Sequence, residues 1–186
     1  MVAQRITSTS DTRRSAKHAI NRAPSPLIAG GVPWVSVMLA SLITYSPVIA
    51  SAPVLPPLAF MLFVAWRMLR PGLLPVWAGL PLGAFDDLYS GQPLGSGVIL
   101  WSLTMLAMEL IDERFLWRGF LQDWLAGAAI FAVYLLVGAG FAGLASGHLA
   151  FTPVLPQLLL TIALYPAVVW LVALLDGLRL TRFRSF

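Results

Sequence analysis

The segment GLPLGAFDDLYSGQPLG, from residue 79 to residue 95, places small residues and an acid at intervals of four. The repeated positions are Gly79, Gly83, Asp87, Gly91 and Gly95. Residues four apart on an α-helix differ by about 40° in direction, so the first three form one slowly drifting stripe. Two glycines in such a stripe let another backbone approach closely, as membrane helices often do. The stripe predicts either helix packing within the chain or a partner-binding groove.

The composition is that of a membrane protein. The chain has 186 residues, of which 59% are hydrophobic and 11% are charged, whereas soluble domains average about 25% charged residues. It contains no cysteine, which excludes a disulfide framework and a thiolate metal site. Two long stretches, 23–66 and 124–175, contain no Asp, Glu, Lys or Arg. Each is long enough for two membrane spans of about 20 residues.

We therefore predict an all-α polytopic membrane protein with six transmembrane helices. The predicted spans are 27–50, 54–69, 71–90, 94–111, 124–146 and 153–175. They form one membrane domain, 27–176, between a basic tail at 1–26 and a second basic tail at 177–186.

The basic residues predict how the six spans are oriented. All 12 lie in the two tails, at the end of the second span or in the loop that follows the fourth span. Because Lys and Arg in short loops stay on the cytoplasmic side, both termini are predicted to be cytoplasmic. The first 26 residues also have the composition of a transit peptide, and VIASAP at 48–53 imitates a signal-peptidase site. Pro53 disfavours cleavage there, so we keep the first span.

Two acids lie near the outer end of the third predicted span. A helix starting at Pro71 places Asp87 about 24 Å along it, close to the outer surface. Asp86 and Asp87 are then either solvated at that surface, or at least one caps the turn or binds a partner. Asp87 is the favoured residue because it shares the glycine face. Gly91 suits a left-handed turn, and Gly95 suits another close approach at the start of the fourth span.

The remaining acids indicate solvation or ion pairing with neighbouring Arg residues rather than catalysis. Glu109, for example, is predicted to pair with Arg114 or Arg118 near the inner boundary, and Asp112, Glu113, Asp123 and Asp176 lie near inner boundaries as well. His148 has no second ligand near it in the sequence, which disfavours a metal site. We find no catalytic constellation and no cofactor motif, and we expect neither a nucleic-acid partner nor a small-molecule substrate.

Two motifs resemble the MreD family of rod shape-determining proteins. The first is AWRMLRP at 65–71 followed by the 79–95 segment, in which Asp87, Leu88, Ser90, Gly91, Leu94 and Gly95 fall on the family pattern and Asp86 is an added acid. The second is LYPAVVW at 164–170, which places Pro166 inside the last span, where proline bends a helix. The resemblance covers about residues 54–175.

The resemblance implies a non-enzymatic, multi-pass inner-membrane subunit of the bacterial cell-elongation machinery. Members of the family act with MreC, and with MreB, RodA and its partner transpeptidase, in lateral peptidoglycan synthesis. The family fold also resembles the substrate-binding subunits of energy-coupling-factor transporters. The alternative is therefore a vitamin-type small-molecule binder that uses Asp86 or Asp87. An intramembrane enzyme has no residues to support it.

Overall fold

The computed structural model describes residues 26–44, 55–114, 119–147 and 153–180. These residues form helices and turns, and no strand occurs among them. The helices are α2 (Pro26–Thr44), α4 (Leu58–Leu69), the 3-10 turn η1 (Val76–Ala78), α5 (Gly79–Tyr89), α6 (Ser96–Arg114), α7 (Phe120–Ser146) and α8 (Val154–Leu180). The all-α prediction is confirmed for this part of the chain.

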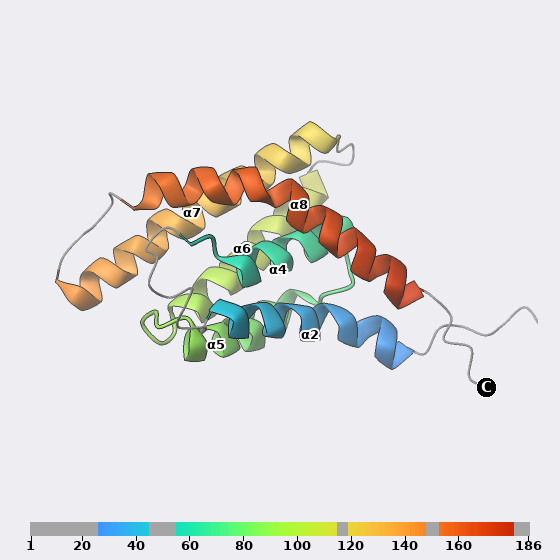
Figure 1. Cartoon of the computed structure of the whole chain (residues 1–186), viewed down its shortest axis with the longest axis horizontal. Helices are drawn as coiled ribbons and strands as arrows, with labels where there is room; N and C mark the ends of the chain where they lie inside the picture. The colour runs from blue at the N-terminus through green and yellow to red at the C-terminus, as the bar shows by residue number, and fades with distance from the viewer. Residues whose placement is uncertain (1–25, 45–54, 115–118, 148–152, 181–186) are drawn as a thin grey trace, which may run out of the picture.

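Successive helices run in alternating directions along the long axis of the molecule (Figure 1). Helices α4, α6 and α8 end on the side where α2 and α7 begin. That side carries Arg67 of α4, Arg70 directly after α4 and Arg179 of α8, and it is called the inner end below because the sequence predicts that these basic residues lie on the cytoplasmic side. The turn between α5 and α6 lies at the opposite, outer end.

Helix α4 lies at the centre of the molecule. Its residues 59–67 are all buried, so every face of the helix is covered by other elements. The rings of Phe60 and Tyr134 stack at 3.8 Å between centroids, and those of Phe63 and Trp101 lie 4.7 Å apart. These aromatic contacts join α4 to α7 and to α6.

Helices α7 and α8 expose much of their apolar surface. They contain apolar stretches long enough to cross a membrane, Leu121–Ser146 and Val154–Arg179. Only 22% of the most apolar window of each is buried. Leu144 is 81% exposed and Trp170 is 66% exposed. Large apolar faces of this kind suit lipid or another membrane helix rather than water.

The third predicted span, 71–90, begins too early. Residues 70–75 form turns, and helical structure starts only with η1. Gly72 has a φ of 86°, and Pro75 disfavours helical geometry in the residue before it. Asp87 is therefore about 18 Å from the start of η1, instead of about 24 Å from Pro71.

The other described helix ends differ less from the prediction. The start of α4 is four residues later than predicted and the start of α7 four residues earlier, and α6 is shifted by two to three residues. The last helix continues to Leu180 rather than ending at 175. Figure 1 shows α8 changing direction about halfway along, and Pro166 lies inside this 27-residue helix. The predicted end of the first span, at residue 50, lies outside the described residues.

Candidate functional site

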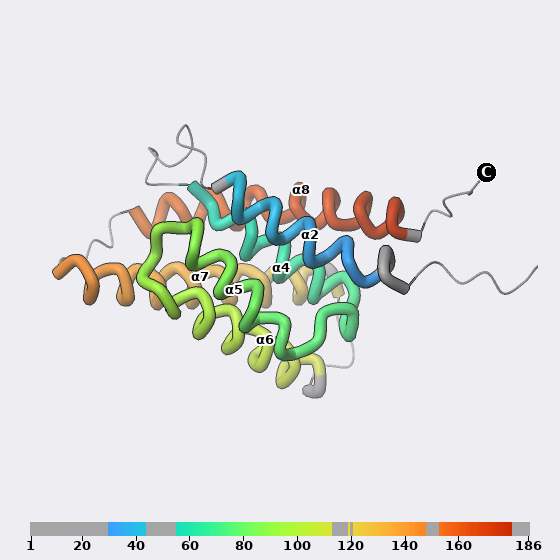
Figure 2. The backbone as a smooth tube through the Cα atoms, turned by 90° about the horizontal axis from the view of Figure 1, so that it is seen from below, coloured from blue at the N-terminus to red at the C-terminus, as the bar shows by residue number. Residues whose placement is uncertain are grey.

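The glycine stripe on α5 packs against α6 of the same chain. A Cβ atom built on Gly79 would lie 2.7 Å from the Trp101 carbonyl oxygen. One built on Gly83 would lie 2.7 Å from the Gly97 carbonyl oxygen. Figure 2 shows α5 and α6 side by side along this contact. The face of α5 that the spacing singled out is therefore occupied from within the molecule.

Asp87 binds the first turn of α6. Its carboxylate accepts hydrogen bonds from the backbone N–H groups of Gly95 at 2.8 Å, Gly97 at 2.7 Å and Val98 at 3.3 Å. The first N–H groups of a helix have no partner within it, and the helix dipole favours an anion there. Asp87 is 4% exposed, so this carboxylate acts as a buried cap supplied by the preceding helix.

Asp86 joins α5 to α2. Its Oδ1 atom accepts a hydrogen bond from the Ser41 hydroxyl at 2.8 Å, and Asp86 is 6% exposed. The interpretation of both acids as solvated surface groups is therefore wrong, because α2 covers one and the start of α6 covers the other.

The turn between α5 and α6 depends on two glycines in left-handed conformations. Gly91 has a φ of 69°, in the region expected from the sequence. Gly95 has a φ of 95°, and nothing lies within 4 Å of a Cβ built on it. The expected close approach at Gly95 is therefore wrong, since its backbone angle is what requires glycine.

Gly97 makes the close contact instead. A Cβ built there would lie 2.5 Å from Asp87 Oδ1. This residue was not singled out from the sequence, although its place two residues after Gly95, at the start of a helix, was a usable signal.

A second polar cluster lies at the inner end and is centred on Arg67, which is 3% exposed. Arg67 Nη2 lies 2.5 Å from Glu109 Oε2, and Arg67 Nη1 lies 2.7 Å from Asp112 Oδ2. Glu109 thus has an ion-pair partner on another helix, α4, and its predicted pairing with Arg114 stays a prediction because the Arg114 side chain is outside the described part of the structure. Arg118 lies outside the described residues. The long-range partner was missed because nothing in the local sequence links α4 to α6.

Arg70 extends the inner cluster from α4 to α8. Its Nε and Nη2 atoms donate to Asp176 Oδ2 at 2.9 and 2.6 Å. Arg179 Nη2 lies 2.8 Å from the other oxygen of Asp176. The end of α4 therefore holds α6 through Arg67 and α8 through Arg70.

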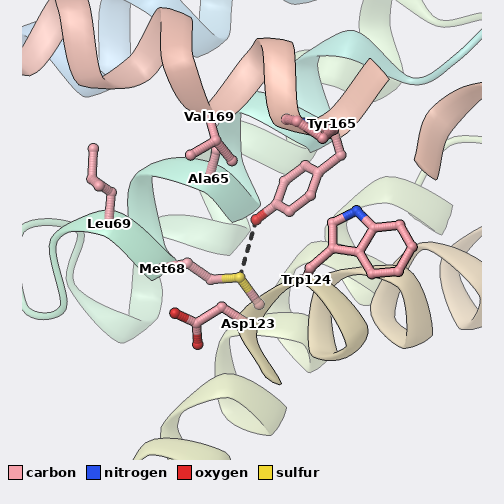
Figure 3. A pocket seen from close by; sticks show the side chains of 8 residues that line it. Ala65, Met68, Leu69, Asp123, Trp124, Tyr165 and Val169 are labelled. Carbon is pink, nitrogen blue, oxygen red and sulfur yellow. Dashed lines mark hydrogen bonds between the residues drawn. The ribbon is translucent and has the colours of Figure 1, made fainter. Parts of the chain in front are cut away.

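Two cavities are lined by residues of both α7 and α8. One, of about 180 Å³, lies between α4, α7 and α8 near the inner end, where the Tyr165 hydroxyl donates to Met68 Sδ at 3.1 Å (Figure 3). Pro166 and Asp123 also line it. The other, of about 280 Å³, is lined by Gln92, Tyr134, Gln157 and the small residues of α7, but by neither Asp86 nor Asp87.

The described residues use their polar side chains to join helices to one another. They contain no group of three or more His, Cys, Asp or Glu side chains that could hold a metal ion. His148 lies outside the described residues. The polar clusters neutralise buried charges and satisfy helix ends, while the exposed apolar faces of α7 and α8 offer contact surfaces.

Comparison with known proteins gives one result. The family model of the rod shape-determining protein MreD matches residues 29–177. No curated protein and no solved structure matched the chain, and the expected resemblance to energy-coupling-factor subunits remains a prediction. The match runs from within α2 to within α8 and includes both polar clusters except Arg179. The chain therefore belongs to the MreD family, whose members determine rod cell shape.

Proposed function

We propose that this chain is a non-enzymatic, multi-pass subunit of the bacterial cell-elongation machinery in the inner membrane. In this role it binds MreC and, through it, MreB, RodA and the partner transpeptidase of lateral peptidoglycan synthesis. The observation that carries the proposal is the family match over residues 29–177. The apolar surface of α7 and α8 supports it, because such surface suits lipid and membrane-embedded partners.

The six-span topology with both termini in the cytoplasm is part of this proposal. Two observations support it. The described helices alternate in direction (Figure 1), and Arg67, Arg70 and Arg179 all lie at the same end of the molecule. A chain with this arrangement satisfies the rule that basic residues stay on the cytoplasmic side.

Within this function, the residues of the 79–95 segment serve helix packing. Gly79 and Gly83 have α6 against them, and Asp86 and Asp87 are engaged by α2 and α6. Gly91 and Gly95 form the connecting turn. We assign partner binding to the exposed surface of α7 and α8, whose course is shaped by Pro166.

A pull-down with a matched pair of tryptophan variants tests this assignment. Trp170 of α8 is 66% exposed, and Trp77 of η1 is 61% exposed on another part of the molecule. Tryptophan is enriched among residues that dominate binding energy. Trp170→Ala should reduce capture of MreC and restoration of rod shape in a deletion strain, whereas Trp77→Ala should retain both. Equal capture by the two variants would place the partner elsewhere.

The alternative function, vitamin-type binding, has one observation in its favour. The 280 Å³ cavity carries the carboxamides of Gln92 and Gln157 and the side chain of Tyr134. A ligand that binds only the folded state raises the melting temperature by mass action. A shift of several degrees with one solute would favour this alternative, and we expect no shift from a panel of vitamins.

A further inference from the structure

The 180 Å³ cavity between α4, α7 and α8, called the inner cavity below, opens on the surface of the helix bundle. Leu69 and Pro166 line it and are exposed, and Trp124 lines it and is half-buried. Figure 1 shows the inner half of α8 running away from the first turns of α7. The inner cavity is therefore in contact with the surroundings of the bundle, which in a membrane are lipid.

The lining of the inner cavity suits a hydrocarbon chain. Most of the residues that line it are apolar, namely Ala65, Met68 and Leu69 of α4, Trp124 of α7, and Pro166 and Val169 of α8. A Cβ atom built on Gly127 of α7 would lie 3.0 Å from Cε1 of Tyr165, so the tyrosine ring bridges α8 and α7 at the outer side of the cavity (Figure 3). An apolar cavity of about 150 Å³ stays dry and binds a molecule as large as benzene. The inner cavity is thus large enough for a short length of an acyl chain.

Arg70 provides a cation at the inner side of this cavity. It directly follows Leu69, which lines the cavity, and its side chain is 49% exposed. A guanidinium has five N–H donors. Two of those of Arg70 donate to Asp176, and the others have no acceptor among the described residues. An exposed guanidinium with donors to spare suits a phosphate group, which it binds through several N–H groups at once.

The inner cavity and the Arg70 contact lie along one face of α8. Asp176, which binds Arg70, follows seven residues after Val169, which lines the cavity. Seven residues make nearly two full turns and advance by about 10 Å, so the two side chains point in almost the same direction. A ligand with an anionic group and a hydrocarbon tail would reach both places. A phospholipid is such a ligand, because its phosphodiester is one glycerol unit away from its acyl chains.

The start of α7 is compatible with a phosphate nearby. Asp123 also lines the inner cavity, but it lies in the first turn of α7, where the helix dipole partly offsets the charge of a carboxylate. Trp124 follows it, and tryptophan is enriched at the level of the lipid headgroups. This part of the cavity therefore has the character of a membrane interface.

We propose that the inner cavity is a phospholipid-binding site, with the phosphodiester at Arg70 and one acyl chain in the cavity. Basic groups beside pockets between transmembrane helices bind lipid headgroups in this way on the cytoplasmic side. An apolar side chain of a neighbouring protein would fill the cavity but would bring no anion to Arg70. The proposal does not depend on the partner proposed above, because it requires only that α7 and α8 face lipid.

Two probes with the same acyl chains test the headgroup contact. Dioleoylphosphatidylglycerol has a phosphodiester and dioleoylglycerol has none. Native mass spectrometry of the delipidated full chain, released from detergent micelles, measures the fraction of protein that retains one probe molecule. The wild type should bind the phospholipid at least about tenfold more tightly than dioleoylglycerol, as expected for hydrogen bonds to a charged group. Arg70→Gln should remove this preference.

Val169→Phe tests the position of the acyl chain. The larger side chain fills the inner cavity, so binding of both probes should fall at least about tenfold, as expected when two or more methylene groups lose their contacts. Val133→Phe is the matched control, because Val133 of α7 is 59% exposed and does not line the cavity. It should bind both probes as the wild type does. Leu69→Trp repeats the test at an exposed position of the lining, and the melting temperature without lipid shows that each variant is folded.

Either of two results would overturn the proposal. Equal binding of the two probes by the wild type would mean that Arg70 does not bind the phosphodiester. Equal retention of the phospholipid by folded Val169→Phe and Val133→Phe would place the lipid outside the inner cavity. Neither result would affect the role in cell elongation, which the pull-down with MreC tests separately.

Discussion

At the scale of single residues, Asp87 carries several contacts at once. Its two oxygens accept hydrogen bonds from three backbone N–H groups at the start of α6, those of Gly95, Gly97 and Val98, and the residue is 4% exposed. Removal of this carboxylate would leave buried donors without an acceptor, and water has little access to replace it. Asp87 therefore contributes more to the stability of the fold than a solvent-exposed helix cap would.

We predict that Asp87→Ala lowers the free energy of unfolding by about 1–3 kcal/mol, the usual effect of unsatisfied buried donors. Asp87→Asn should lower the free energy of unfolding by a smaller amount, because one side-chain oxygen remains as an acceptor. Thermal unfolding in detergent measures both, with Leu88→Ala as the control, since Leu88 is 68% exposed. A Leu88→Ala variant as unstable as Asp87→Ala would contradict the role of the cap.

Gly83→Ala should destabilise the protein although it adds only a methyl group. The new Cβ would lie 2.7 Å from a backbone oxygen of α6, and overpacking of this kind costs about 1–3 kcal/mol. Gly30→Ala is the matched control, because nothing lies within 4 Å of its Cβ position. A comparison of the two melting temperatures checks this. A Gly83→Ala variant with the melting temperature of the wild type would mean that α5 and α6 can separate freely.

Local spacing predicted some of these residues and not others. Gly79, Gly83 and Asp87 stand out because their contacts repeat along one helix face. Ser41, which lies 45 positions from its partner Asp86, has no such local signal. Arg67 has no local sequence signal either, because the packing of α4 among the other helices decides which residues lie next to it.

At the scale of elements, α4 organises the inner end. Its Arg67 side chain is 4% exposed and contacts α6, whereas its Arg70 side chain is 49% exposed and contacts α8. Asp176 keeps Arg179 as a second partner if Arg70 is lost. The two arginines should therefore differ in their effect on stability.

We predict that Arg67→Met destabilises the protein by about 1.5–3 kcal/mol, the usual value of hydrogen bonds to charged groups, because Glu109 and Asp112 remain partly exposed to solvent. Arg70→Met should cost about 0–1 kcal/mol, in the range of exposed pairs. Adding Glu109→Gln and Asp112→Asn to Arg67→Met should restore part of the loss, because fewer unpaired charges remain. Unfolding curves of the three variants and of the wild type measure this, and equal losses for the two arginines would refute the distinction.

The start of the third helix shows why hydropathy alone did not predict the first residue of that helix. Apolar residues fill 71–90 without a charge before Asp86, so hydropathy alone suggested one continuous helix. Pro71, Gly72 and Pro75 replace its first turns with an irregular connection. The other described helices begin and end within about one turn of the prediction, except that α8 ends later. The agreement arises because a long apolar segment in a membrane has few ways, other than a helix, to satisfy its backbone hydrogen bonds.

At the scale of the whole molecule, topology is the property to test. We predict that reporter tags at residue 2 and after Phe186 report the cytoplasm, and that tags inserted after Ala50 and after Gly147 report the periplasm. The reason is that all 12 basic residues segregate to one side of a six-span chain. A cytoplasmic signal after Gly147 would exclude this topology.

The unequal lengths of the helices have a consequence for the surrounding bilayer. Helices α7 and α8, with 27 residues each, are about 40 Å long, whereas η1 and α5 together reach about 22 Å. The hydrocarbon core of a bilayer is about 30 Å thick, so it must thin beside α5 or be replaced there by protein. Beside α7 and α8, either the hydrocarbon must thicken or the helices must tilt. Such hydrophobic mismatch costs fractions of a kcal/mol per ångström. Neighbouring membrane proteins would then be sorted around this one. Those with short transmembrane helices would gather on its α5 side, and those with long transmembrane helices beside α7 and α8.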